Sequence, residues 1–316
     1  MNQLTKTHVI FGTGPVGLAV MEELIGQGKD VKMINRSGHA NVPEQVEVIG
    51  TDASDIKNTR DICKGASVVY NCTNVDYHRW TDLLPELHTA ILEGAAYAEV
   101  PLVVMENLYM YGSSGGKPMT EETPYQAETR KGRVRTQMTV ELFEAHRAGK
   151  VKAVSGRASD FFGPFVHLSM LGDQIIRPAL EGKPANLLGN PDLPHTYTYI
   201  SDIGKALVIL GENEKAFGKP WHIPSPATVT TRQVVEILYR LTGHPVKFRA
   251  APRMMVSILG LFNKQMRELK EMMYEFEEPF IMDDSSFRDT FGMEATPLEQ
   301  ALQEAIRWFR STPKSA

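Results

Sequence analysis

Residues 9–17, Val9-Ile10-Phe11-Gly12-Thr13-Gly14-Pro15-Val16-Gly17, give the strongest indication of the fold. An apolar run suited to a buried strand ends in the pattern G-x-G-x-x-G, and an amphipathic stretch suited to a helix follows at once. The first glycine permits a tight turn, the second lets the backbone approach a pyrophosphate, and the third lets the helix pack against the strand. The helix N-terminus would direct N–H groups at the phosphates. The pattern predicts a dinucleotide site at Gly12, Gly14, Pro15, Val16 and Gly17; the alternative is a glycine-rich turn in an unrelated α/β domain.

The residues after the second apolar run bear on the choice of cofactor. The run 31–35 ends in Asn35, and Arg36 follows it. Sites that prefer NAD commonly place an acidic residue here for the ribose hydroxyls. Asn35 is neutral and would not repel a 2′-phosphate, and Arg36 could bind that phosphate through two parallel N–H bonds. The sequence favours NADP, with NAD as the alternative if Arg36 is only a solvated charge.

Composition and charge narrow the class of protein. The chain has 316 residues, of which 42% are hydrophobic, and a net charge of −4, which gives no attraction to nucleic acid or to an anionic membrane. Two cysteines in this length indicate a reducing compartment. No apolar run is long enough to span a bilayer, and no spacing of His, Cys, Asp and Glu indicates a metal site. We expect a cytoplasmic protein that takes a small-molecule substrate and binds no nucleic acid, membrane or metal.

The first half of the chain alternates apolar runs with amphipathic stretches, which predicts a Rossmann-type, doubly wound parallel sheet in an α/β protein. The strands are expected at 7–11, 31–35, 46–49, 67–71, 97–105 and 153–158. The intervening helices are expected at 16–28, 55–64, 80–94 and 131–148. We expect residues 1–160 to form the dinucleotide-binding domain. Residues 161–316 would form mainly a smaller C-terminal α/β substrate lobe, with some segments returning to the Rossmann core.

Three helices are expected in the second half. One covers 168–181. Thr230 and Gln233 have the spacing of a capping box before a helix at 234–241. Thr296 and Glu299 repeat that spacing, with Pro297 at the first helical position.

Four later segments each match, loosely, a sequence motif of one known superfamily. Their order and spacing together are specific for it. The segments are Gly50–Asp55, Val69–Asn74, Asp160–Pro164 and His195–Asp202. Through them the chain resembles the extended short-chain dehydrogenase/reductases, the superfamily of NAD-dependent epimerases and dehydratases, up to about residue 312. The resemblance implies that Asp52 and Ala53 lie near the adenine. It places Cys72, Thr73 and Asn74 beside the cofactor.

The chain departs from that superfamily at its catalytic positions. The resemblance places Asn107 where the family has a carbonyl-polarising Ser or Thr. It places Lys131 on the proton-donating Tyr and Arg135 on the Lys that holds the nicotinamide ribose. Arg135 could still hold an oxyanion or donate to ribose hydroxyls. Lys131 could donate a proton if burial and nearby positive charges favour its neutral form; a solvated lysine is the alternative.

Other side chains could deliver or hold a proton. Asn107 can donate an amide N–H but cannot relay a proton, and Tyr109 at the same strand end is a further candidate donor. Three histidines, His78, His167 and His195, are candidate acid–base groups, although surface or hydrogen-bonded roles explain them more simply. Asp160 could face the substrate or cap a loop.

These features predict an oxidoreductase that reduces a small carbonyl substrate with NADPH through a non-standard proton donor. Two alternatives stay open: a non-catalytic protein that senses NADP(H), and a sugar-nucleotide epimerase or dehydratase. The resemblance alone also implies a homodimer formed through helices 80–94 and 131–148.

Overall fold

The apolar runs of the first half pair into one seven-stranded sheet, in the order β11-β6-β5-β4-β1-β2-β3. The computed structural model describes residues 7–259, 261–262 and 264–312. The strands are β1 (His8–Phe11), β2 (Val31–Asn35), β3 (Glu47–Gly50), β4 (Val69–Asn71), β5 (Leu102–Glu106), β6 (Ala153–Arg157) and β11 (Pro220–His222). Every neighbouring pair is parallel. Because the strand order reverses between β1 and β4, the predicted Rossmann-type, doubly wound α/β fold is confirmed.

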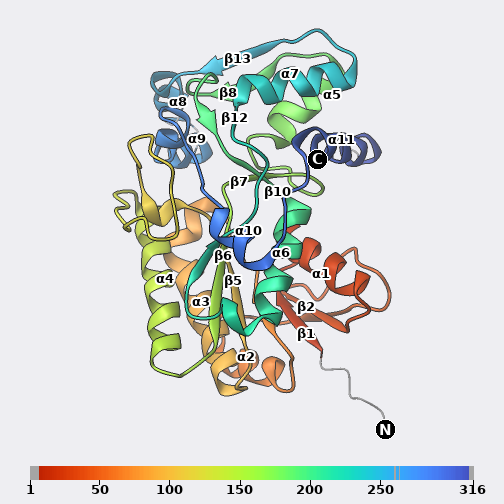
Figure 1. The fold of residues 1–316 in the computed structure, drawn as a ribbon, viewed down its shortest axis with the longest axis vertical. Coiled ribbons are helices and arrows are strands. Elements are labelled where there is room, and N and C mark those ends of the chain that lie inside the picture. Colours follow the sequence, from red (N-terminus) through yellow and green to blue (C-terminus); the bar gives the residue numbers. More distant parts are fainter. Residues whose placement is uncertain (1–6, 260, 263, 313–316) are drawn as a thin grey trace. The chain divides into compact units, whose positions relative to one another are not determined.

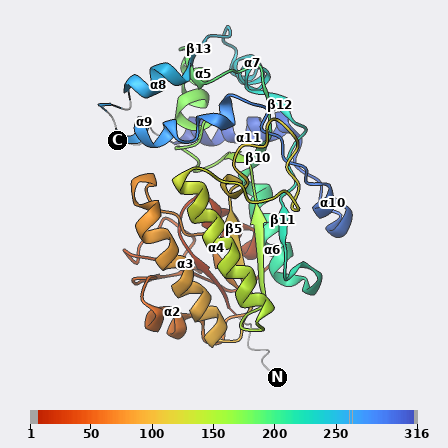
Figure 2. The same cartoon turned by 90° about the vertical axis from the view of Figure 1, so that its left-hand side faces the viewer.

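Helices cover both faces of this sheet (Figures 1 and 2). On one face lie α2 (Ile56–Cys63), α3 (Trp80–Tyr97) and α4 (Arg130–Arg147), and on the other lie α1 (Pro15–Gly26) and α6 (Ile200–Glu212). A Cβ atom on Gly204 would lie 2.4 Å from the carbonyl oxygen of Ala19, so α6 packs directly on α1.

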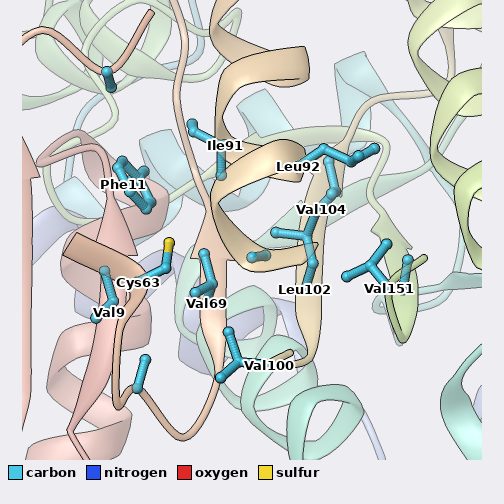
Figure 3. Close-up of a cluster of buried hydrophobic side chains, with 14 of the residues drawn as sticks. Val9, Phe11, Cys63, Val69, Ile91, Leu92, Val100, Leu102, Val104 and Val151 are labelled. Carbon is cyan, nitrogen blue, oxygen red and sulfur yellow. The ribbon is translucent and has the colours of Figure 1, made fainter. Parts of the chain in front are cut away.

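One hydrophobic core cluster lies between the sheet and α2, α3 and α4 (Figure 3). Alternate strand residues such as Val9 and Phe11 of β1 point to this side and meet Ile91 and Leu92 of α3. Fully burying a side chain of this size contributes roughly 1.5–3 kcal/mol. The apolar run that precedes the glycine turn is therefore anchored in the core.

The chain divides into two compact units. Among the described residues, unit 1 takes those within Met1–Met110, Arg130–Ala158 and Ile203–Ile223. Unit 2 takes those within Tyr111–Thr129, Ser159–Asp202 and Pro224–Ala316. The whole seven-stranded sheet lies in unit 1, with β11 supplied by the third segment. The assignment of residues 161–316 to substrate binding stays a prediction.

Unit 2 holds short paired strands and most of the later helices. The pairs are β7 (Asp160–Phe162) with β10 (Tyr197–Tyr199), β9 (Pro194–His195) with β12 (Val229–Thr230), and β8 (Ala185–Leu188) with β13 (Phe248–Ala251). The helices are α5 (Arg177–Glu181), α7 (Thr231–Thr242), α8 (Arg253–Leu259), α9 (Lys264–Lys270), α10 (Ser285–Phe291) and α11 (Leu298–Ser311). No helix among the residues placed in either unit is long and apolar enough to cross a membrane.

Two sequence-based boundaries need correction. The apolar run 97–105 does not start a strand at its first residue, because Tyr97 ends α3 and the left-handed residue Glu99 (φ 56°) turns the chain before β5. The expected helix at 168–181 is shorter: residues 168–171 form a bend and a turn, a π-helix covers Gly172–Ile176, and α5 follows.

The two predicted capping boxes differ in outcome. Thr230 and Gln233 form both reciprocal bonds at the start of α7, as predicted. Thr296 instead donates its N–H and hydroxyl to the Asp202 carboxylate, and Pro297 precedes the first helical residue of α11. The second box therefore does not form, because a carboxylate distant in sequence takes the threonine's donors.

Candidate active site

The glycine turn joins β1 to α1 with almost no spare volume. Gly12 has φ +110°, and a Cβ there would lie 2.6 Å from the carbonyl oxygen of Cys72. A Cβ on Gly17 would lie 2.0 Å from the carbonyl oxygen of Gly12. Gly14, in contrast, has no atom within 4 Å of its would-be Cβ among the residues placed in the structure. The turn is therefore closed towards the protein at two glycines and open at the third, where a pyrophosphate would approach.

The start of α1 suits an anion. Gly14 is the N-cap, Pro15 takes the first turn of the helix, and no acidic residue lies in that turn. Val16 and Gly17 are buried, so the helix start is fixed against the sheet. The first N–H groups of a helix have no partners within the helix, and the helix dipole favours negative charge there. These residues fit a bound dinucleotide.

Asn35 ends β2 and organises the loop that follows. Its side-chain amide donates to the Thr13 hydroxyl at 3.0 Å and to the carbonyl oxygen of His39 at 2.8 Å. Its carbonyl accepts the N–H of Gly38 at 2.7 Å and the Ser37 hydroxyl at 3.3 Å. The side chain thus ties the loop after β2 to the glycine turn.

The other predicted cofactor residues lie at the carboxyl ends of neighbouring strands. Asp52 follows β3 and is exposed, and the N–H and hydroxyl of Ser54, more than the nearby charge of Arg36, lower the pKa of its carboxyl. Ala53 is buried in the core. Cys72, Thr73 and Asn74 follow β4, where Cys72 donates its N–H to the carbonyl oxygen of Phe11. These strands are parallel neighbours in the order β4-β1-β2-β3. All the predicted cofactor residues therefore lie at the carboxyl ends of the strands, on the same side of the sheet.

Lys131 is not a solvated surface lysine. It lies in the first turn of α4 and is 1% exposed. Its ammonium nitrogen lies 5.2 Å from the ring centroid of Tyr77, which follows β4. The Tyr77 hydroxyl in turn lies 2.7 Å from the hydroxyl of Tyr109, which follows β5. Two of the predicted catalytic residues, Lys131 and Tyr109, are therefore linked through a tyrosine that the sequence did not single out.

Arg135 lies one helical turn further along α4 and is also buried. Its guanidinium carbon lies 4.8 Å from the Trp80 ring centroid. Within the described residues, its Nε has no hydrogen-bond partner. Burial lowers the pKa of Arg135, while Glu106 and the phenols of Tyr109 and Tyr77 oppose that shift. This buried N–H is available to a bound group.

Glu106, the last residue of β5, is the carboxylate that faces the buried arginines of this cluster. It is fully buried, and its carboxylate accepts Nε of Arg157 at 3.0 Å and the hydroxyl of Thr139. Burial alone would raise the pKa of Glu106, but Arg157, Thr139 and Arg135 outweigh burial and hold the pKa below its ordinary value. Glu106 is therefore an ionised carboxylate next to two buried guanidinium groups.

Asn107 lies directly after this carboxylate. Its side-chain carbonyl accepts the N–H of Tyr109 at 3.3 Å, which closes the turn after β5. This bond uses the carbonyl, and the amide N–H groups are the donors that Asn107 offers to a substrate. The structure thus brings Asn107, Tyr109, Lys131 and Arg135 to one end of the sheet.

The remaining candidates lie elsewhere. His78 is exposed beyond β4. In unit 2, His167 contacts the Asp173 carboxylate at 3.2 Å. His195 contacts Asp160 at 3.1 Å, so two candidates 35 positions apart in sequence form one pair. A hydrogen-bonded role for His167 and His195 agrees with the simpler interpretation. Among the residues that the structure covers, no cluster of His, Cys, Asp and Glu could hold a metal ion.

Glu275 lies near the pair formed by His195 and Asp160. Its buried carboxyl makes the stability of the protein depend on pH. It is 2% exposed, and burial, with a further contribution from the charge of Asp160, raises the pKa of its carboxyl well above the ordinary value. The folded protein therefore keeps this proton at pH values where the unfolded chain has released it. Stability falls as pH rises between the two pKa values, with a slope approaching about 1.4 kcal/mol per pH unit.

Glu275→Gln removes this ionisation. We expect the variant to gain stability over the parent as pH rises from about 5 to about 8, measured by urea unfolding. Glu277→Gln, at a carboxylate paired with Arg253, is the matched control and should show no such trend. A stability difference between parent and Glu275→Gln that stays constant with pH would contradict the prediction.

A parallel sheet with a glycine turn after its first strand defines a Rossmann-type dinucleotide-binding protein. The sequence profile of the NAD dependent epimerase/dehydratase family matches residues 9–223. The chain belongs to this family of NAD-dependent enzymes, and its expected resemblance is confirmed.

Individual relatives are distant. The UDP-glucose 4-epimerase of Corynebacterium glutamicum is 23% identical over 276 residues, which make up 78% of this chain and 84% of that protein. The structure of a UDP-N-acetylglucosamine 4-epimerase from Bacillus cereus matches with a TM-score of 0.78 and 13% identity, covering 98% of this chain and 99% of that one. A dTDP-glucose 4,6-dehydratase from Bacillus anthracis, solved with NAD, matches with a TM-score of 0.80 and 16% identity, covering 97% of each chain. At these identities the structural matches show the fold.

Sequence reasoning missed three residues of the site: Tyr77, Glu106 and Arg157. The available signals were a tyrosine close after β4 and charged residues ending two otherwise apolar strands. Such residues are common on protein surfaces, so these signals alone could not identify the cluster.

Proposed function

We propose that this protein binds a nicotinamide dinucleotide along the carboxyl ends of β3, β2, β1 and β4, and uses it as a sugar-nucleotide epimerase or dehydratase. The main support is the family match over residues 9–223, which includes the open glycine turn and the polar cluster after β5. The three relatives described above carry the names of enzymes of nucleotide sugars. The first expectation, reduction of a small carbonyl compound, has no such support, so the sugar-nucleotide alternative becomes the proposal.

The residues at the end of β5 and the start of α4 suit this chemistry. A bound nicotinamide would take up and return a hydride. Tyr109 would exchange the proton of the substrate hydroxyl, since a phenol both donates and accepts. Lys131 and Arg135 would stabilise negative charge on the substrate oxygen, and the amide of Asn107 would donate to it. These roles replace the Ser, Tyr and Lys that the resemblance places at positions 107, 131 and 135.

We further propose that NADP(H) is preferred over NAD(H) in this NAD-dependent family. Arg36 is exposed at the end of β2, directly after the Asn35 that fixes the loop 35–39. A guanidinium and the Ser37 hydroxyl beside a neutral Asn35 suit a 2′-phosphate. Cytoplasmic location and a homodimer through α3 and α4 stay predictions of the sequence.

Arg36→Ala tests the cofactor preference. Loss of a charge-assisted contact should weaken NADP⁺ binding by about tenfold or more, while NAD⁺ binding changes little. Isothermal titration calorimetry of both cofactors measures this change. Arg147→Ala, at an exposed arginine that ends α4, is the control and should leave both affinities intact. Equal losses for the two cofactors, or none, would contradict a 2′-phosphate contact.

The reaction is tested directly with nucleotide sugars. Purified protein is incubated with UDP-glucose, UDP-N-acetylglucosamine or dTDP-glucose and either cofactor. Nuclear magnetic resonance follows the sugar, and absorbance follows reduced nicotinamide. We expect conversion of at least one nucleotide sugar and none of free glucose. Tyr109→Phe should slow conversion by about a hundredfold or more while cofactor binding persists. Cofactor binding with no change in any sugar would instead indicate a binding protein without turnover.

A further inference from the structure

Two phenols form a hydrogen-bonded pair in the candidate site. Tyr77 lies in the short 3₁₀-helix after β4, and Tyr109 begins the one after β5. Because β4 and β5 are parallel neighbours, both tyrosines emerge at the same edge of the sheet. Their hydroxyl oxygens lie 2.7 Å apart, so one phenol donates to the other.

Aromatic packing fixes this pair. The Trp80 ring centroid lies 5.1 Å from that of Tyr77, in an edge-to-face arrangement, and 5.7 Å from that of Tyr109. Tyr109 is 7% exposed, whereas Tyr77 is 37% exposed. Tyr109 is therefore enclosed, whereas part of the Tyr77 residue reaches solvent.

Cationic groups from α4 act on both phenols. The Lys131 ammonium lies over the Tyr77 ring, and the charge of Arg135 interacts with both hydroxyls. The carboxylate that faces Arg135 from β5 is Glu106, which also binds Arg157. His88 on α3 lies close to these groups, and burial lowers its pKa to about 4, so it is neutral at physiological pH. Nearby positive charge and a hydrogen bond donated by a second phenol both favour an ionised phenol.

We propose that Tyr77 and Tyr109 share one proton as a dyad. Tyr109 acts as the base that accepts a proton from the substrate. Tyr77 donates a hydrogen bond to Tyr109 and connects it to solvent. This inference rests on the proposed function. The Tyr109 oxygen would take the proton of the substrate hydroxyl while the adjacent C–H bond breaks. The substrate would lose two electrons and become a carbonyl, and a bound nicotinamide would supply the acceptor for the hydride. Return of hydride and proton reverses the step, so Tyr77 acts through Tyr109 and does not touch substrate.

The dyad is tested without any substrate by titrating the ultraviolet absorbance of tyrosinate. In the parent protein, one tyrosinate should form at lower pH than the others. It should vanish in both Tyr77→Phe and Tyr109→Phe, because the two phenols titrate as one system. Lys131→Met should shift it to higher pH. Tyr97→Phe is the matched control, since Arg60 and Lys64 lie over that ring at 5.1 and 5.7 Å. It should leave the early titration unchanged.

A pH profile separates the dyad from a purely structural role. Tyr77→Phe should keep its circular dichroism and cofactor affinity but lose about tenfold or more in rate at neutral pH, with recovery as pH rises. Superimposable titrations of the parent and Tyr77→Phe would overturn the dyad, even if nucleotide sugars are converted. An early tyrosinate in a protein that converts no nucleotide sugar would support the dyad and overturn the proposed function.

Discussion

Glu106→Gln should lower the free energy of unfolding by about 3–5 kcal/mol, because it removes the negative charge that faces a buried guanidinium. Glu106 and Arg157 are both 0% exposed and face each other across β5 and β6. The same carboxylate offsets the charge of Arg135. In this variant two buried cations, Arg157 and Arg135, lose the negative charge of this carboxylate. Urea unfolding at neutral pH measures the loss.

Two further variants make this prediction specific. Arg157→Met should cost less than Glu106→Gln, because Glu106 then keeps Arg135 and Thr139 as partners. Glu93→Gln, at a carboxylate paired with Lys150 and Arg60 nearer the surface, should cost about 1 kcal/mol or less. A larger loss in Arg157→Met than in Glu106→Gln would show that the arginine does not depend on this carboxylate.

Gly14→Ala should leave the fold intact and weaken cofactor binding by about a hundredfold or more, because a methyl group would occupy the path of the pyrophosphate. Gly14 has φ −79° and ψ −177°, an extended conformation that any residue adopts. Its would-be Cβ has no neighbour within 4 Å in the described part of the chain. The loss should therefore appear in calorimetry with NADP⁺ or NAD⁺ and not in the thermal unfolding midpoint.

Gly26→Ala provides the matched control at the other end of α1. Gly26 also has no atom within 4 Å of its would-be Cβ among the residues described, and it lies far along the helix from the turn. This substitution should leave cofactor affinity unchanged. If Gly14→Ala binds either cofactor as tightly as the parent, the phosphates do not lie on this turn.

The structural features best predicted from the sequence are those that depend only on residues close together in the chain. The strand, turn and helix around Gly12 follow from a local pattern whose steric demands are met within a few residues and at one contact with Cys72. The capping box at Thr230 is also local, and it forms. The box at Thr296 fails because the Asp202 carboxylate, 94 positions earlier, takes its donors. A local pattern cannot include such a competitor.

The polar cluster was harder to predict for the same reason. Lys131 and Tyr109 were proposed from their matched positions, but the partner that joins them, Tyr77, precedes Tyr109 by 32 residues. Glu106 and Arg157 each end a buried strand, and only the register of β5 on β6 places one directly beside the other. His195 and Asp160 are likewise joined within unit 2. Contacts between residues so far apart in the sequence are set by the packing of the folded chain, and a local sequence pattern does not reveal them.

The interrupted path of the chain through unit 1 has a consequence for synthesis. A ribosome must complete Pro220–His222 before the β6 edge acquires its neighbour, long after the glycine turn has emerged. A gene fragment ending near residue 160 would also lack the helix whose Leu207 and Leu210 pack over Gly156. Such a fragment would expose an unpaired edge strand and an apolar face of the sheet. We expect it to self-associate. Production of unit 1 on its own therefore requires the returning segment 203–223 as well.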